Sequence, residues 1–398
     1  MKYKFISKFL LINIYIVIIS SCNNSSKSNN NNNNNSEILQ FDVSKWDTKK
    51  AIPQKAIKNI IFIPLGTNKD ILMSDIAKII PLNEKYYVMD ISFTNSILVF
   101  TNKGKHIQSI GVCGRGPGEY VRLRDFTIDK DGNRLLILDS SSRKIVIYNL
   151  DTGAFIENIK FDYSAKSIAM PNKNTVSLFS HNYTNDYTIR NINIDNKSQN
   201  GFLKNDGTLT EITMGYTDFY QSKHVYYAPT ASNVVYKITE KRVLPYILLD
   251  FGEYKIPEDR LRTAIKNDLS GSFTTHNLLL RDKFGYGISR IIENNDFLTF
   301  SFRIKQKEIS VIYSKKSKKY FYGSKFEGDL NPIGNLLSPI AVNKNQFLCI
   351  SNTYDILGVK KTILKQNNSK LRQQFEELTK KIAQESNPVI ISIEFNQF

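Results

Sequence analysis

The chain has 398 residues, of which 41% are apolar and 23% are charged. That length and composition exclude a disordered chain, because they allow a sizeable core to be buried. Three cysteines exclude a disulfide-stapled fold, and four histidines make a site with several zinc ions hard to build. The 54 Lys and Arg outnumber the 37 Asp and Glu, which gives a formal charge of +17 and favours anionic partners such as glycans or lipid headgroups. No nucleic-acid-binding motif is present, so we expect no nucleic-acid partner.

Residues 1–21 have the pattern of a lipoprotein signal peptide. Three lysines precede an apolar stretch, residues 9–19, that is too short to span a bilayer. Two serines then stand directly before Cys22, which resembles the bacterial lipobox, in which this cysteine is acylated and becomes the new N-terminus. We therefore predict a lipid anchor at Cys22 and a place in the cell envelope, at the outer membrane on its periplasmic or surface side. An ordinary signal peptide with an incidental cysteine is the alternative.

Residues 22–50 are expected to form a flexible tether. Their first part holds seven consecutive asparagines, Asn29 to Asn35, and no apolar residue whose burial would offset the entropy of ordering. Removal of the signal takes away three lysines and lowers the formal charge from +17 to +14. Residues 51–398 are the predicted folded domain.

A repeat defines the fold of this domain. Residues 74–110 have the pattern of four short strands separated by turn residues, and residues 124–160 repeat it. Equivalent residues such as Asp90 and Asp139 lie 49 positions apart. Four strands at about this period are typical of the blades of a β-propeller.

Shorter patterns predict four further blades. Strands are expected at 174–180 and 187–194 in the third blade, at 224–228, 233–238 and 243–249 in the fourth, at 296–302, 309–313 and 319–322 in the fifth, and at 346–350 and 388–395 in the sixth. The sixth blade then lacks an outer strand, while a strand pattern at residues 59–65 remains unused. We predict an all-β, six-bladed propeller in which the N- and C-terminal strands share the last blade and close the ring.

Two short helical insertions interrupt the predicted strands. The first, at 257–267, begins with a proline and two acids, as the first turn of a helix favours. The second, at 370–384, carries an apolar stripe at helical spacing, formed by Leu371, Phe375, Leu378 and Ile382. The stripe is expected to pack on the propeller, and docking to a partner is the alternative.

Four stretches of the chain resemble a known family. They are Ile63–Gly66, Gly111–Tyr120, Asp250–Pro257 and Asn387–Ile391. Over residues 40–398 the chain is similar to the secreted, lipid-anchored six-bladed β-propellers of the NHL-like kind. The resemblance implies the architecture and the envelope location, and it implies no established chemistry.

Propeller topology places the candidate ligand-binding residues on one face. The connections from each outer strand to the next inner strand lie on the same face as the connections between the second and third strands, and such loops usually carry function. The candidates on this face are Asp90, Arg115, Glu119, Tyr120, Asp139, His181, Thr230, Arg303 and Asn352. The opposite face gathers the basic turn residues Lys103, Lys105, Lys241, Arg242, Lys315, Lys316, Lys318 and Lys319.

Several candidates have two interpretations. The Gly-rich loop around Arg115 and Glu119 is either an anion clamp or a tight connection that bonds neighbouring blades, and the absence of a following Gly-Lys-Ser/Thr favours the connection. Asp90 and Asp139 form either part of a Ca²⁺ site or turn caps, and their equivalent positions favour turn caps. A disulfide between Cys113 and Cys349 stays open, because spacing does not establish geometry.

Two classes of function remain. The first is a binding or scaffold protein that holds a peptide, glycan or protein partner on the candidate face, as a monomer and without a cofactor. The second is a metal-dependent propeller hydrolase or lyase, since some enzymes resemble this chain in blade count. The sequence contains no recognisable set of nucleophile, base and orienting residue, so the binding protein is favoured and no catalytic residue is predicted.

Overall fold

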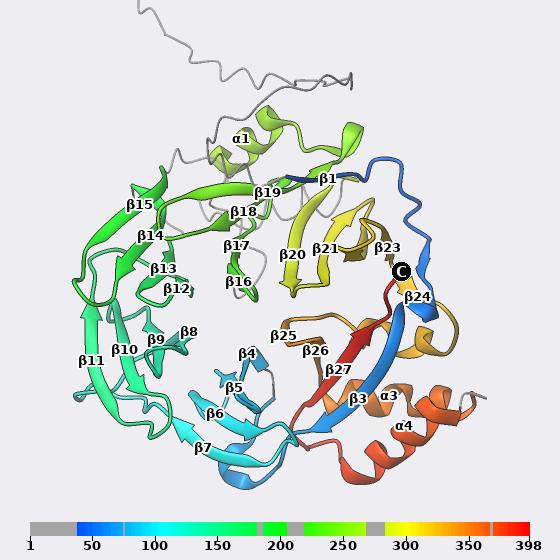
Figure 1. Cartoon of the computed structure of the whole chain (residues 1–398), viewed down its shortest axis with the longest axis horizontal. Helices are drawn as coiled ribbons and strands as arrows, with labels where there is room; N and C mark the ends of the chain where they lie inside the picture. The colour runs from blue at the N-terminus through cyan, green and yellow to red at the C-terminus, as the bar shows by residue number, and fades with distance from the viewer. Residues whose placement is uncertain (1–37, 75, 181–185, 205–218, 268–282, 367–368) are drawn as a thin grey trace, which may run out of the picture. The chain divides into compact units, whose positions relative to one another are not determined.

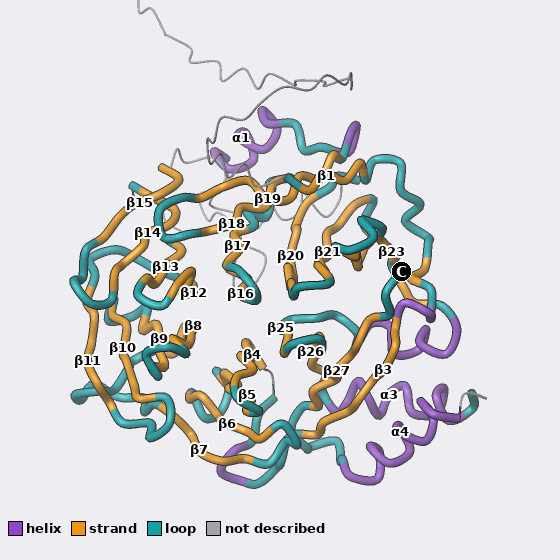
Figure 2. The backbone as a smooth tube through the Cα atoms, in the orientation of Figure 1, coloured by secondary structure: helices purple, strands orange, loops and turns teal. Residues whose placement is uncertain are grey.

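The computed structural model describes residues 38–74, 76–180, 186–204, 219–267, 283–366 and 369–398. Residues 38–398 form one compact unit. In this unit six sheets, antiparallel except for one parallel rim strand, stand around a central axis (Figures 1 and 2), with one edge of each sheet at the axis and the other at the rim. The all-β, six-bladed propeller predicted from the repeat is confirmed.

The first three blades each use four consecutive strands, which follow one another from the axis to the rim. Blade 1 contains β4 (Ile76–Leu82), β5 (Lys85–Asp90), β6 (Ser96–Thr101) and β7 (His106–Ile110). Blade 2 contains β8 (Leu123–Asp129), β9 (Arg134–Asp139), β10 (Lys144–Asn149) and β11 (Phe155–Lys160). Blade 3 contains β12 (Ser167–Asn172), β13 (Thr175–Phe179), β14 (Tyr187–Asn193) and β15 (Gln199–Lys204).

The last three blades follow the same order with local changes. Blade 4 contains β16 (Phe219–Gln221), β17 (Val225–Tyr227), β18 (Val234–Ile238), β19 (Val243–Asp250) and, at its rim, β1 (Leu39–Asp42). Blade 5 contains β20 (Tyr286–Glu293), β21 (Phe297–Ile304), β22 (Lys307–Ser314) and β23 (Tyr320–Gly323). Blade 6 contains β25 (Ala341–Asn343), β26 (Gln346–Ser351), β27 (Val389–Phe395) and β3 (Ile57–Pro64).

Middle strands such as β9 carry a continuous apolar run because both faces of the sheet are covered. In β9, Leu135 to Leu138 are fully buried, although successive side chains point to opposite faces. One face contributes to the cluster between blades 1 and 2, which includes Ile137, and the other to the cluster between blades 2 and 3, which includes Leu138. Such strands are therefore continuously apolar, whereas strands of a sheet with one solvent-exposed face alternate apolar and polar residues.

The two ends of the chain close the ring in blade 6. β3 pairs antiparallel with β27 from Pro64 and Val389 to Ile57 and Phe395. The N-terminal strand thus supplies the outer strand that blade 6 lacks in the C-terminal sequence, as predicted. With β3 in place, β27 is paired on both of its edges, as the third strands of the other blades are.

The predicted N-terminal boundary of the folded unit, residue 51, is wrong by about a dozen residues, because the unit begins at Ile38. Residues 38–50 were expected in the tether, but β1 pairs parallel with β19 and extends blade 4 by one strand. Trp46 then stacks on Tyr322 of blade 5, with ring centroids 4.0 Å apart, and on Tyr320 at 5.1 Å. β2 (Ala51–Ile52) pairs parallel with β24 (Lys325–Phe326) before the chain enters β3. These contacts hold in place a segment whose polar composition had predicted no ordered structure.

Helices occupy the connections on one face, and one of them was not predicted. The described helices are α1 (Glu258–Asn267), α3 (Thr353–Leu364) and α4 (Ser369–Lys381), with 3₁₀ segments η1 (Gln54–Ala56), η2 (Lys69–Ile71), η3 (Gly252–Tyr254) and η4 (Gly328–Leu336). α1 and α4 confirm the two expected insertions. α3 was missed because Gly358 and several β-branched residues interrupt its pattern.

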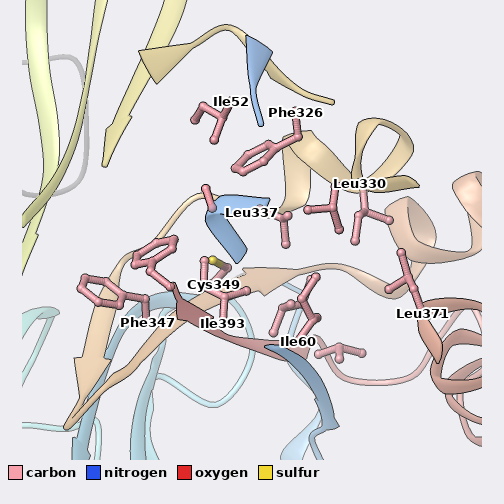
Figure 3. Packing of buried hydrophobic residues seen from close by; sticks show 14 of the residues in the cluster. Ile52, Ile60, Phe326, Leu330, Leu337, Phe347, Cys349, Leu371 and Ile393 are labelled. Carbon is pink, nitrogen blue, oxygen red and sulfur yellow. The ribbon is translucent and has the colours of Figure 1, made fainter. Parts of the chain in front are cut away.

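The stripe of α4 packs on the propeller, as expected. Leu371, Phe375, Leu378 and Ile382 are all at most 8% exposed. They belong to the cluster of blade 6, β24 and η4 shown in part in Figure 3, where Leu371 and Ile60 lie on the same side of β27. Among the described helices none combines the length and apolarity needed to cross a bilayer.

Candidate functional site

We call the face that carries α1, α3 and α4 the loop face, and the opposite one the turn face. The Gly-rich loop lies on the loop face between blades 1 and 2, where it bonds mostly to itself and to those blades. Glu119 accepts a hydrogen bond from the N–H of Gly116 at 2.7 Å, and its own carbonyl accepts one from the Lys144 Nζ at 2.6 Å. Tyr120 is fully buried in the cluster between these blades, and burial raises the pKa of its hydroxyl. Arg115 is exposed.

The two equivalent aspartates cap turns on the same face. The carboxylate of Asp90 accepts hydrogen bonds from the backbone N–H of Ser92, Phe93 and Thr94. That of Asp139 accepts bonds from the N–H of Ser141 and Ser142 and also from Val121 at 2.9 Å. Both carboxylates are fully buried, so these bonds stabilise the charged groups.

The remaining predicted residues separate into three places. Asn352 is exposed at the start of α3, where its carbonyl accepts the first bond of the helix. His181 lies outside the described residues. Thr230 and Arg303 alone among the predicted residues line a central cavity.

The central cavity has a volume of about 530 Å³. Its walls come from the inner strands of blades 1, 4, 5 and 6, which lie nearest the axis in Figure 1. The lining residues that determine its chemistry are Lys78, Ile80, Gln221, Thr230, Tyr286, Gly287, Ser289, Arg290, Arg303, Glu308, Ile340 and Val342. A cavity of this size, lined by both apolar and polar side chains, falls within the volume range of small-molecule sites.

Polar side chains tie the inner strands of blades 1 to 4 together. Lys78 on β4 donates to Asp125 on β8 at 2.9 Å, and the second carboxylate oxygen of Asp125 accepts the N–H of Ile168 on β12 at 2.8 Å. Gln221 on β16 accepts from Thr127 on β8 at 2.8 Å. Lys78 is thus already neutralised, and these ties hold one side of the cavity rigid.

The opposite side of the cavity carries a cluster with an excess of positive charge. Arg290 donates through Nη1 to Glu308 Oε1, and Arg303 Nη2 lies 3.5 Å from Glu308 Oε2. Arg303 also hydrogen-bonds Tyr286, whose pKa is raised mainly by burial. We call Arg290, Arg303 and Glu308 the arginine cluster. Two guanidinium groups share one carboxylate there, so the cluster has a net charge of +1.

A protein-family model matches most of the chain. Residues 18–394 match DUF4934, described as a domain of unknown function. The chain belongs to the DUF4934 family. A search of curated proteins finds no match.

One solved structure shares the fold of this DUF4934 protein. A Bacteroides fragilis protein described as exported superposes with a TM-score of 0.76 at 17% identity, covering 91% of this chain and all of that one. A DUF4221 member from Bacteroides vulgatus gives a TM-score of 0.48 at 10% identity, with 85% of this chain and 97% of that one covered. The first likeness supports the propeller fold.

The two cysteines of the folded unit do not pair. Cys113 is exposed in the Gly-rich loop and Cys349 is buried in β26, and both are free thiols. Burial raises the pKa of the Cys349 thiol. Within the described residues, no three His, Cys, Asp or Glu side chains are grouped closely enough to hold a metal ion.

The sequence patterns did not predict Arg290 and Glu308 as site residues. Arg290 lies on an inner strand that carries a glycine and an arginine and therefore has no strand pattern. Glu308 had a usable signal, because it faces Arg303 across the hairpin of β21 and β22. An opposite-charge pair at that spacing indicates a cross-strand contact.

Proposed function

We propose that this DUF4934 protein is a lipid-anchored envelope protein that binds a ligand in its central cavity. The single observation that carries the proposal is the cavity of about 530 Å³ in which Thr230, Tyr286 and the arginine cluster converge against aliphatic walls. The occupant we consider is a peptide, a glycan fragment or a segment of a partner protein, bound by a monomer. The Bacteroides fragilis protein described as exported supports a location outside the cytoplasm.

Anchoring is tested at the predicted acylation site. In cells fed an alkyne-labelled fatty acid, the wild-type protein should take up the label and sediment with membranes, because acyl chains contribute about 0.8 kcal/mol per buried CH₂. Cys22→Ser should lose the label and leave the membrane fraction. Cys113→Ser is the matched control, since Cys113 is an exposed free thiol and should not affect labelling. Equal labelling of the Cys22→Ser variant would reject the anchor.

Ligand binding is tested by filling the cavity. Ser289 lines the cavity from β20, so Ser289→Phe should occupy part of its volume. In a thermal-shift screen of oligosaccharides and short peptides, at least one compound should raise the melting temperature of the wild type by about 3 °C or more. The same compound should have no effect on Ser289→Phe. The control is Ser317→Phe, an exposed position on the turn face of the same blade. An unchanged shift in Ser289→Phe would place binding elsewhere.

A further inference from the structure

The inner strand of blade 5 is irregular where it borders the cavity. The pairing of β20 with β21 shifts register on both sides of Ser289. Gly287 and Arg290, which flank that serine, have φ values of +68° and +51°. A left-handed conformation is uncommon for an arginine, and bulges in strands often redirect side chains beside functional sites.

This strand presents both backbone and side chains to the cavity. A Cβ atom built on Gly287 would meet no atom within 4 Å, so the backbone there faces open space. Tyr286 to Arg290 all line the cavity, as do the consecutive residues Ile76 to Pro81 of β4, because the inner strands turn their edge toward the axis. Arg290 therefore lies beside the cavity together with Arg303, which comes from the neighbouring strand.

The arginine cluster has more donors than its own carboxylate uses. Each guanidinium group carries five N–H donors in a planar fork. The side chains of Arg290, Arg303 and Glu308 are 39%, 42% and 39% exposed, so all three meet solvent at the cavity. A guanidinium fork matches a carboxylate in geometry and charge, and such paired bonds are stronger than neutral ones.

The rest of the cavity fits the body of an organic acid. Ile80 on β4, Ile340 before β25 and Val342 on β25 form aliphatic walls. Lys78 is neutralised by Asp125, so the arginine cluster is the site of excess charge in the cavity lining. An apolar body against these walls would leave its acidic end at the arginine cluster.

Resting on the proposed function, we propose that the ligand of the central cavity carries a carboxylate, which Arg290 and Arg303 bind together while Glu308 acts as their internal counterion. The ligand has an apolar body that lies against β4 and β25. A peptide with a free C-terminus and a uronic acid both present this chemistry. Separate probes distinguish the two sources.

The experiment compares acids with their neutral counterparts by ligand-observed NMR at millimolar concentration. The probes are the tripeptide Ala-Leu-Leu and its C-terminal amide, and digalacturonate and its methyl ester. At least one acid should bind the wild type about tenfold more tightly than its neutral counterpart, as expected for a hydrogen-bonded charge. The acid that does so identifies the source. Arg303→Gln should remove this preference, and Arg242→Gln on the turn face should keep it.

Glu308→Gln separates a counterion from a merely structural residue. Loss of the carboxylate leaves both guanidinium groups to the ligand, so the affinity for the acid should rise about threefold to tenfold. A fall in affinity would contradict the assigned role. Suppose that acid and neutral probes bind equally and that Ser289→Phe abolishes the binding of both. That result would overturn the proposal that the ligand carries a carboxylate, and the proposed function would stand. If Ser289→Phe leaves acid binding unchanged, the cavity is rejected as the binding site. If neither acid binds, the carboxylate proposal is overturned.

Discussion

A chain that begins at Leu65, and therefore lacks β3, should not unfold cooperatively. β27 would keep β26 but lose its outer partner along its whole length. Its backbone would then form an open edge in a strand whose side chains are buried at six of seven positions. α4 would also lose its support, because Phe62 packs against Phe375 at 5.6 Å and Gln374 donates to the carbonyl of Ile60. Domains are stable by only roughly 5–15 kcal/mol, so we expect the loss of a whole strand and of the support of α4 to remove the cooperative fold.

Differential scanning calorimetry tests this on three chains that begin at different residues. The chain from Ile38 contains the whole folded unit and should melt like the full-length chain. The chain from Pro53 loses β1, Trp46 and β2 and should melt cooperatively at a lower temperature, since it keeps the closing strand. The chain from Leu65 should show no cooperative transition and should aggregate through β27. A sharp transition in this shortest chain would mean that ring closure does not depend on β3.

The fold could be predicted because the middle strands carry its information. β9 and its equivalents are buried on both faces, so they appear as apolar runs at a regular spacing whatever the ligand. The unused pattern at residues 59–65 then identified the closing strand. Trp46 and β1 could not be predicted in the same way, since their order comes from contacts with Tyr322 and β19 that are distant in sequence.

The candidate site was harder to predict because it depends on the inner strands. β16 and β25 have only three residues each, and β20 is interrupted by Gly287 and Arg290. Such strands give no periodic signal, yet they form most of the cavity wall. Topology predicted Thr230 and Arg303 as candidates and both line the cavity, but Arg290, which pairs with Glu308, comes from a strand of irregular register.

The basic cluster on the turn face shows a second limit of sequence patterns. Lys315 was grouped with solvated turn lysines, but it binds the buried carboxylate of Glu293 in the same blade 5. Tyr226 and Tyr246 of blade 4 donate to the same carboxylate, Tyr246 at 2.7 Å. The carboxylate of Glu293 in blade 5 therefore links blades 4 and 5.

Replacing Glu293 should destabilise the propeller more than removing any exposed charge. Its side chain is 3% exposed, and Glu293→Ala would take this acceptor from two tyrosine hydroxyls and leave the Lys315 ammonium with the carbonyl of Asn294 and no counterion. Breaking a buried pair in this way costs about 3–5 kcal/mol, measurable as a lower denaturant midpoint. Glu157→Gln is the control, because the Lys197–Glu157 pair is about two-fifths exposed and should contribute at most about 1 kcal/mol. Equal midpoints for the two variants would contradict the proposed role of Glu293.

The pH dependence of stability gives an independent test of the same carboxylate. Burial alone would raise the pKa of Glu293, but hydrogen bonds from Lys315 and Tyr226 outweigh burial and hold the pKa below its usual value. The unfolded chain then binds the proton first as the pH falls, so the stabilisation is present above about pH 5 and is lost in acid. The free energy of unfolding of the wild type should fall more steeply between about pH 5 and 3 than that of Glu293→Gln, which has no proton to bind there. Parallel curves would show that Glu293 has the same pKa in both states, and the link between blades 4 and 5 would then owe nothing to its charge.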